Sequence, residues 1–210
     1  MSRVALLGDS IFDNAAYTDG GPSVIDHLRQ KLPSGWSADL LAVDGAVTSD
    51  VKHQLRKLAA INTHLVLSVG GNDALLRADV LETAVSSSSE AFLLLADAAD
   101  EFETTYLKAL DSCIKCDLPL VVCTIYGGNF PDVAYQRAAR MALLAFNDVI
   151  IRAAAQNNLR VLDLRQVCNR PEDYANPIEP SVVGGEKIAQ SIVKALEEGR
   201  FNGEGAHIAA

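Results

Sequence analysis

Apolar runs of strand length alternate with longer segments of helical periodicity along this chain. The runs that predict strands are 3–7, 38–43, 65–69, 120–124 and 161–164. The segments that predict helices are roughly 23–31, 48–60, 90–116, 133–157 and 182–198. Strict alternation of strand and helix predicts a parallel sheet with both faces covered. We therefore expect an α/β fold, a three-layer α/β/α sandwich with a five-stranded parallel sheet of flavodoxin-like order.

Length and charge narrow the class of protein. The 210 residues favour one domain over 1–200, followed by a flexible tail at 201–210. The net charge of −9 at pH 7 argues against nucleic acid or an anionic membrane as the main partner, since both attract clustered Lys and Arg. A small-molecule substrate is compatible with this composition. The sequence does not indicate an oligomeric state.

The beginning of the chain and its cysteines suggest a compartment. The first strand starts directly after Met1 and Ser2, which leaves no room for a secretory signal. No apolar run approaches the ~18 residues of a membrane span, so we expect a cytoplasmic protein. Cys113 and Cys116 have the spacing of a redox or zinc pair, but no second close Cys or His pair completes a metal site. We expect reduced, packed cysteines and no metal or nucleotide cofactor.

Four polar segments follow predicted strands, at the edge where open α/β sheets place their sites. They are Gly8-Asp9-Ser10, the segment 44–48 around Gly45, the segment 70–73 around Asn72, and the segment 176–181 around Glu179. Each segment alone is an ordinary turn, because Gly, Asn and Asp are common turn residues. Together, in this order, they are expected to converge on one site. Aromatic residues that follow strand ends could line it or could simply pack: Tyr17, Tyr126, Phe130 and Tyr174.

In order and spacing these segments resemble the SGNH (GDSL-type) hydrolase family over almost the whole chain. The resemblance implies that Ser10 is a nucleophile for acyl transfer. It also implies an oxyanion site made by the backbone N–H groups of Ser10 and Gly45 and the side-chain amide of Asn72. One such donor is typically worth ~3 kcal/mol of transition-state stabilisation. The expected activity is that of an esterase or lipase-like hydrolase acting on a small-molecule ester.

The last block departs from the family pattern, which is Asp-x-x-His-Pro-Ser before the final helix. Here Glu179 stands at the histidine position and Asn176 at the aspartate position, followed by Pro180 and Ser181. A carboxylate can accept the serine proton, although its reference pKa of about 4.3 makes it a weaker base than histidine at about 6.5. Asn176 is expected to hydrogen-bond and orient Glu179. An alternative alignment would place Asp173 at the aspartate position and Asn176 at the histidine position, but Pro180 and Ser181 would then no longer match the family's Pro-Ser pair.

None of the four histidines stands at the position of the base. His64 opens the third strand at its amino end, roughly 25 Å from the segment that follows that strand. His53 lies more than one turn into a helix, and His27 belongs to the first helix, as a surface or satisfied residue. His207 lies in the tail and stays open as an alternative base.

Two functions remain after these observations. In the first, the protein is a serine esterase in which Glu179 is an unusual and weak base. In the second, the same pocket holds a carbonyl or carboxylate ligand without turnover, because the usual catalytic histidine is absent. The residue at position 179 discriminates between them.

Overall fold

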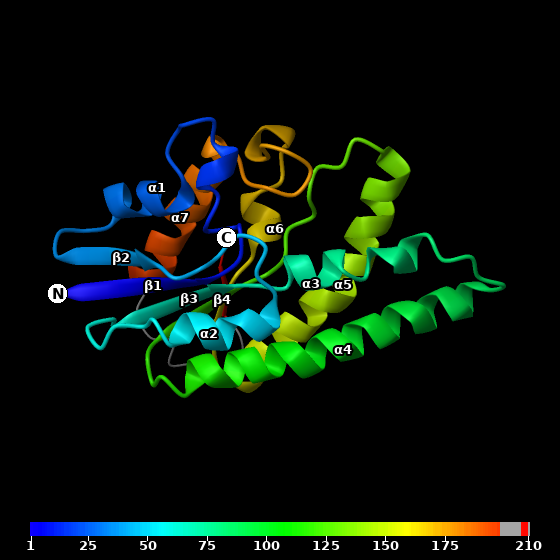
Figure 1. Ribbon diagram of the computed structural model, residues 1–210, viewed down its shortest axis with the longest axis horizontal. Helices are drawn as coiled ribbons and strands as arrows, with labels where there is room; N and C mark the ends of the chain where they lie inside the picture. Colours follow the sequence, from blue (N-terminus) through cyan, green and yellow to red (C-terminus); the bar gives the residue numbers. More distant parts are fainter. Residues whose placement is uncertain (198–206, 210) are drawn as a thin grey trace.

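The computed structural model describes residues 1–197 and 207–209. Six strands form one parallel sheet in the order β2-β1-β3-β4-β5-β6 (Figure 1). The strands are β1 Ser2–Gly8, β2 Trp36–Leu40, β3 His64–Ser68, β4 Leu120–Cys123, β5 Arg160–Leu162 and β6 His207–Ala209. The α/β sandwich with its five parallel strands is therefore confirmed, including the flavodoxin-like order of the first five.

The sixth strand was not predicted. Residues 207–209 pair with β5 at the sheet edge, and three residues are too short to show a strand pattern in the sequence. These three residues belong to the segment 201–210 that was expected to be a flexible tail, which stays a prediction, and 198–206 and 210 lie outside the described residues. The backbone of His207 is four strand spacings from β1, about 19 Å, and it is paired with Arg160 at the beginning of β5.

Helices cover both faces of the sheet (Figure 1). On one face lie α1 Val24–Lys31, α6 Leu164–Val167 and α7 Val182–Glu197; on the other lie α2 Val51–Leu55, α4 Ser88–Ile114 and α5 Val133–Gln156. Short elements stand near the carboxyl edge of the sheet: α3 Gly71–Leu75 and the 3₁₀ turns Ala15–Tyr17, Thr48–Asp50, Ala78–Leu81 (η3) and Pro171–Asp173. No described helix is long and apolar enough to cross a membrane; the cytoplasmic location stays a prediction.

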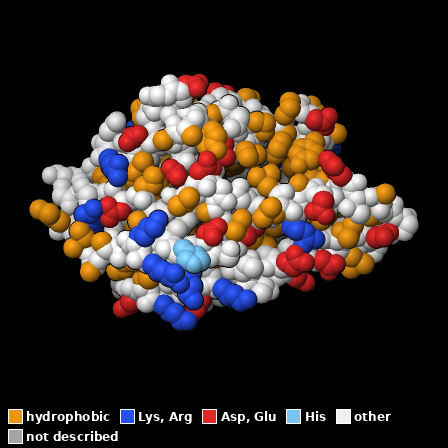
Figure 2. All heavy atoms as spheres, in the orientation of Figure 1, with side chains coloured by type: hydrophobic (Ala, Val, Ile, Leu, Met, Phe, Trp, Pro, Cys, Tyr) orange, Lys and Arg blue, Asp and Glu red, His pale blue; other side chains and the backbone are white. Residues whose placement is uncertain are grey.

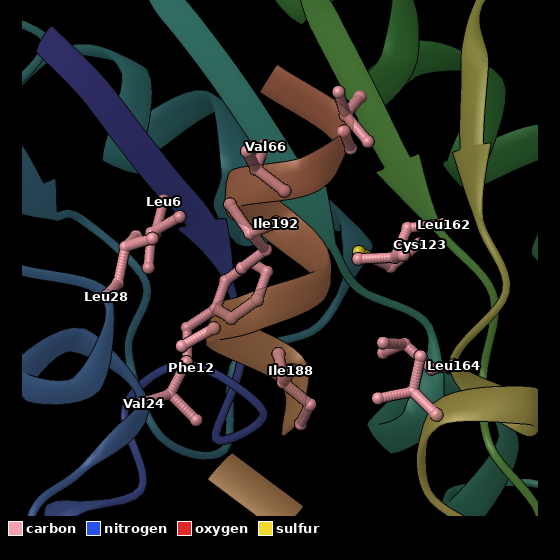
Figure 3. Close-up of a cluster of buried hydrophobic side chains, with 14 of the residues drawn as sticks. Leu6, Phe12, Val24, Leu28, Val66, Cys123, Leu162, Leu164, Ile188 and Ile192 are labelled. Atoms are coloured by element: carbon pink, nitrogen blue, oxygen red, sulfur yellow. The ribbon is translucent and has the colours of Figure 1, made fainter. Parts of the chain in front are cut away.

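Strand β1 shows why the sheet is buried on both sides. Val4 and Leu6 face the core beneath α1 and α7, whereas Ala5 and Leu7 face the core beneath α4 and α5. Because neighbouring side chains of a strand point to opposite faces, a continuous apolar run is what a doubly covered strand requires. Figure 3 shows the first of these cores, with Leu6 of β1, Phe12 and Ile192 of α7 among its side chains.

The predicted helix 48–60 is shorter than expected. A 3₁₀ turn covers its first three residues, α2 ends at Leu55, and the backbone N–H groups of Lys57 and Leu58 then donate to carbonyls only three residues back.

The four cysteines form no disulfide bond. Each has a free thiol, and Cys113, Cys123 and Cys168 are buried, in line with the expectation of reduced, packed cysteines.

Candidate active site

Ser10 sits in a tight turn directly after β1. Gly8 ends the strand at a φ of +127°, and the N–H of Asp9 donates to the carbonyl of Ser68 on β3 at 3.2 Å. The side chain and carbonyl of Asp9 then accept the backbone N–H groups of Ile11 and Phe12. Ser10 is only 6% exposed. Its own N–H has no partner among the described residues, so that donor remains available.

A buried glutamine fixes the end of β1. Gln54 of α2 accepts the N–H of Gly8 at 2.8 Å and donates to its carbonyl at 2.7 Å. Gln54 is buried, so both of its polar atoms are satisfied by one backbone position. This role could not be predicted from the sequence, because a glutamine in an amphipathic segment is usually a surface residue.

Glu179 reaches Ser10 from the segment that precedes α7. An antiparallel bridge between Tyr174 and Pro180, with the N–H of Ala175 donating to the carbonyl of Glu179 at 2.9 Å, shapes this segment. The hydroxyl of Ser10 donates to Oε1 of Glu179 at 3.0 Å. Glu179 is 5% exposed, and its Oε2 is buried without a hydrogen-bond partner among the described residues.

Asn176 contacts Glu179 through the backbone. Its Oδ1 accepts the N–H groups of Ile178 and Glu179, each at 2.9 Å. The asparagine therefore fixes the turn that carries Glu179, whereas we expected it to orient the side chain. The alternative alignment of the last block, which uses Asp173 in place of Asn176, is not supported. Asp173 is fully buried and accepts a hydrogen bond from Lys187 at 2.5 Å.

The other two expected oxyanion residues lie in loops that are bonded to each other. Asn72 donates from Nδ2 to the carbonyl of Ala46 at 2.9 Å, which uses one of its two amide hydrogens. Asp73 accepts both the N–H and the hydroxyl of Thr48. Gly45 has a φ of +77°, and its N–H has no partner among the described residues. The role of Asp73 was not predicted from the sequence.

The histidines whose side chains are described stay away from Ser10. His64, at the start of β3, stacks on Trp36 with ring centroids 4.8 Å apart. His53 belongs to α2, and His27 is buried on α1 with Nε2 unpartnered among the described residues. His27 is therefore neither a surface residue nor a fully satisfied one. Among the described side chains, Glu179 is the one that accepts a hydrogen bond from the Ser10 hydroxyl.

Burial raises the pKa values of two carboxyl groups in the site. Burial, together with the charges of Glu179 and Asp73, raises the pKa of Asp9 to about 8, against the opposing effect of the N–H of Ile11. Burial also raises the pKa of Glu179; its hydrogen bond from Ser10 opposes the shift and the charge of Asp44 adds to it. The raised pKa favours the protonated, neutral form of Asp9 near pH 7, and it makes Glu179 a better proton acceptor than a solvent-exposed glutamate.

This raised pKa of Asp9 predicts a pH-dependent effect of the substitution Asp9→Asn. Between the ordinary aspartate pKa of about 3.9 and about 8, the folded protein holds a proton that the unfolded chain has lost, so stability falls as pH rises through this window. The amide keeps the acceptor for the N–H of Ile11. We expect Asp9→Asn to unfold at the same urea concentration as wild type at pH 4 and at a higher one at pH 8. An equal midpoint at pH 8 would contradict the shift.

An apolar pocket opens beside Ser10 and Glu179. The space that it encloses, together with open solvent at its mouth, is about 960 Å³. Of the four aromatic residues singled out from the sequence, Tyr126 and Phe130 line it. Tyr174 packs edge-on against Tyr126, and Tyr17 instead donates to Asp44 at 2.7 Å.

A parallel α/β sandwich with a serine on the turn after β1 and an acceptor before the last helix is the arrangement found in the SGNH hydrolase fold. Residues 6–183 match the GDSL-like Lipase/Acylhydrolase family. The chain therefore belongs to this family. No curated protein sequence matches the chain significantly.

Solved structures with the same fold include several ester hydrolases. An extracellular lipase from Streptomyces rimosus is 19% identical, with a TM-score of 0.67 over 94% of this chain and 99% of the other. A phospholipase A1 from Streptomyces albidoflavus is 21% identical, with a TM-score of 0.65 over 94% and 98%. A carbohydrate acetylesterase from Sinorhizobium meliloti is 10% identical, with a TM-score of 0.67 over 94% and 99%. At these identities the likeness shows the fold alone.

Proposed function

We propose that this protein is a serine esterase in which Glu179 replaces histidine as the base. The observation that carries the proposal is the 3.0 Å hydrogen bond from the Ser10 hydroxyl to Oε1 of a buried glutamate. This distance is within the range for proton transfer from a nucleophile to its base. Membership of a GDSL-like lipase and acylhydrolase family supports the same reaction class.

The reaction proceeds in two halves. Ser10 Oγ attacks the ester carbonyl carbon while its proton passes to Glu179, and the alcohol then leaves with that proton. Water next attacks the acyl-enzyme, giving its proton to Glu179, and the acid is released as Ser10 takes the proton back. The glutamate starts and ends each half as a carboxylate. No positive charge forms on it, so an aspartate at position 176 is not needed to balance one.

The oxyanion of each tetrahedral intermediate needs donors that are not already used. The free N–H groups of Ser10 and Gly45 support this role, as does the second amide hydrogen of Asn72. The hydrogen bond from Asn72 to the carbonyl of Ala46 fixes the direction of that amide. Fixed donors stabilise developing charge without reorganising during the reaction.

The charge of the site favours a neutral ester over a carboxylate ligand. Burial and the negative charge of Asp44 raise the pKa of Glu179. Burial also raises the pKa of Asp9, which favours its neutral form. A bound carboxylate would add another negative charge next to Glu179, at an electrostatic cost in a buried site. Binding of a carbonyl ligand without turnover is therefore the alternative that an activity assay must exclude.

The direct test is hydrolysis of short p-nitrophenyl esters by wild type and Ser10→Ala. We expect Ser10→Ala to lower kcat by at least about 10³-fold, since the nucleophile is lost while the oxyanion donors remain. Ser34→Ala, which removes an exposed hydroxyl, is the matched control and should keep the wild-type rate. Equal rates in wild type and Ser10→Ala would leave only the binding function.

A further inference from the structure

The pocket beside Ser10 extends away from the polar end of the site into an apolar channel. It passes between the segment α3 to η3 on one side and helices α4 and α5 on the other. Its lining there is hydrocarbon: Val80, Leu81, Leu95, Leu143 and Phe146. We call this part of the pocket the α4–α5 channel.

Small side chains keep the α4–α5 channel open. Ala98 of α4 and Ala139 and Ala142 of α5 line it, and a larger side chain at any of them would occupy its space. On α5, the lining residues from Tyr135 to Phe146 recur at helical spacing. Eleven residues of helix rise about 16 Å, so the channel runs much further than an acetyl group reaches.

The charges of the α4–α5 channel do not favour an ionic ligand. Among the described residues that line the pocket, Arg77 is the one basic side chain, and it is ion-paired with Glu101. The carboxyl groups at the polar end, Asp9 and Glu179, belong to the site already described.

Figure 2 shows hydrophobic side chains gathered at the upper right, over the beginning of α5 and the loop before it. Val133, at the start of α5, is 74% exposed.

We infer that the α4–α5 channel binds the acyl chain of the substrate, so that this protein acts on esters of medium-chain fatty acids in preference to acetyl esters. The inference rests on the proposed function, since it assigns the acyl side of the same reaction. With the acyl chain in the channel, the alcohol group must leave toward the opposite side of Ser10. Burying each further methylene is expected to raise kcat/KM about fourfold.

The test compares p-nitrophenyl acetate and octanoate, each below its critical micelle concentration, in wild type and channel variants. We expect wild type to favour octanoate by about 10³-fold or more in kcat/KM, since six additional methylene groups at about fourfold each multiply to this order. Ala139→Leu and Ala142→Leu should lower kcat/KM for octanoate at least about tenfold and leave acetate within about twofold. Ala138→Leu, on the exposed side of α5, is the matched control and should change neither.

Ala139 is buried, so a leucine there could destabilise the fold, whereas Ala142 is only half-buried and should tolerate a leucine. The Ala142→Leu variant therefore separates loss of channel space from loss of folding. Wild type that prefers acetate, or an Ala142→Leu variant that loses both substrates equally, would overturn the inference. Hydrolysis of acetate alone that depends on Ser10 would overturn it and leave the proposed function intact.

A binding measurement tests the α4–α5 channel without turnover. Calorimetric titration of Ser10→Ala with 1-octanol should show saturable binding that is lost when Ala142→Leu is added, whereas ethanol should not bind. Absence of octanol binding to Ser10→Ala would overturn the inference even if every ester proves inert.

Discussion

Replacement of Glu179 by glutamine is expected to lower kcat for ester hydrolysis by about 10²–10⁴-fold with little change in KM, the range typical for loss of a general base. The amide oxygen can still accept the 3.0 Å hydrogen bond from Ser10, so the geometry is kept. An amide cannot take the proton at neutral pH, and the nucleophile remains a hydroxyl. Steady-state kinetics with p-nitrophenyl esters at pH 7 measure this effect.

Two further variants sharpen this prediction. Glu172→Gln removes an exposed carboxylate from the same segment and should leave kcat within about twofold of wild type. Glu179→His restores a proton acceptor and should recover part of the activity that Glu179→Gln loses. Full activity in Glu179→Gln, together with loss in Ser10→Ala, would mean that a group other than Glu179 is the base.

Replacement of Gly8 by alanine is expected to destabilise the fold by more than about 4 kcal/mol, a size reserved for steric or buried-charge defects. A Cβ at this position would lie 1.7 Å from the carbonyl oxygen of Ser68, and the φ of +127° is unfavourable for any side chain. The backbone of Gly8 cannot move aside, because both of its polar groups are bonded to Gln54. Urea unfolding followed by circular dichroism measures the loss.

Gly35→Ala is the matched control for Gly8→Ala. Gly35 also has a positive φ, +85°, but a Cβ there would meet nothing within 4 Å. Its replacement should cost only the strain of a left-handed residue, about 1–2 kcal/mol. Similar losses in the two variants would show that the contact with Ser68 does not determine the requirement for glycine at the end of β1.

The order of the strands could be predicted because burial on both faces produces continuous apolar runs separated by amphipathic helices. The position of Ser10 followed from the same pattern, since a strand that ends in Gly8 presents the next residues at the carboxyl edge. The contact between Ser10 and Glu179, which are 169 residues apart, was predicted from the frame of the last block. Site residues could therefore be predicted from the sequence where the end of a strand, or the start of the last helix, determines their place in the fold.

Contacts that depend on the direction of one side chain could not be predicted. Gln54 and Asp73 are ordinary polar residues in the sequence, and only the packed loops show that each bonds a particular backbone group. Asn176 was expected to orient the side chain of Glu179, whereas it accepts the backbone N–H groups of Ile178 and Glu179. The α4–α5 channel is likewise formed by helices that are distant in sequence from Ser10. The size of a space between packed helices depends on their crossing and separation, which periodicity alone does not fix.

Covalent labelling tests the central claim, that Ser10 is a nucleophile activated by Glu179, most directly. Wild type would be treated with an alkyl fluorophosphonate, and the modified residue and labelling rate determined by intact-protein and peptide mass spectrometry. We predict one adduct, on Ser10, that forms at the same rate in Glu172→Gln, much more slowly in Glu179→Gln, and not at all in Ser10→Ala. An unlabelled wild type, or labelling of Ser10 at an unchanged rate in Glu179→Gln, would contradict the claim.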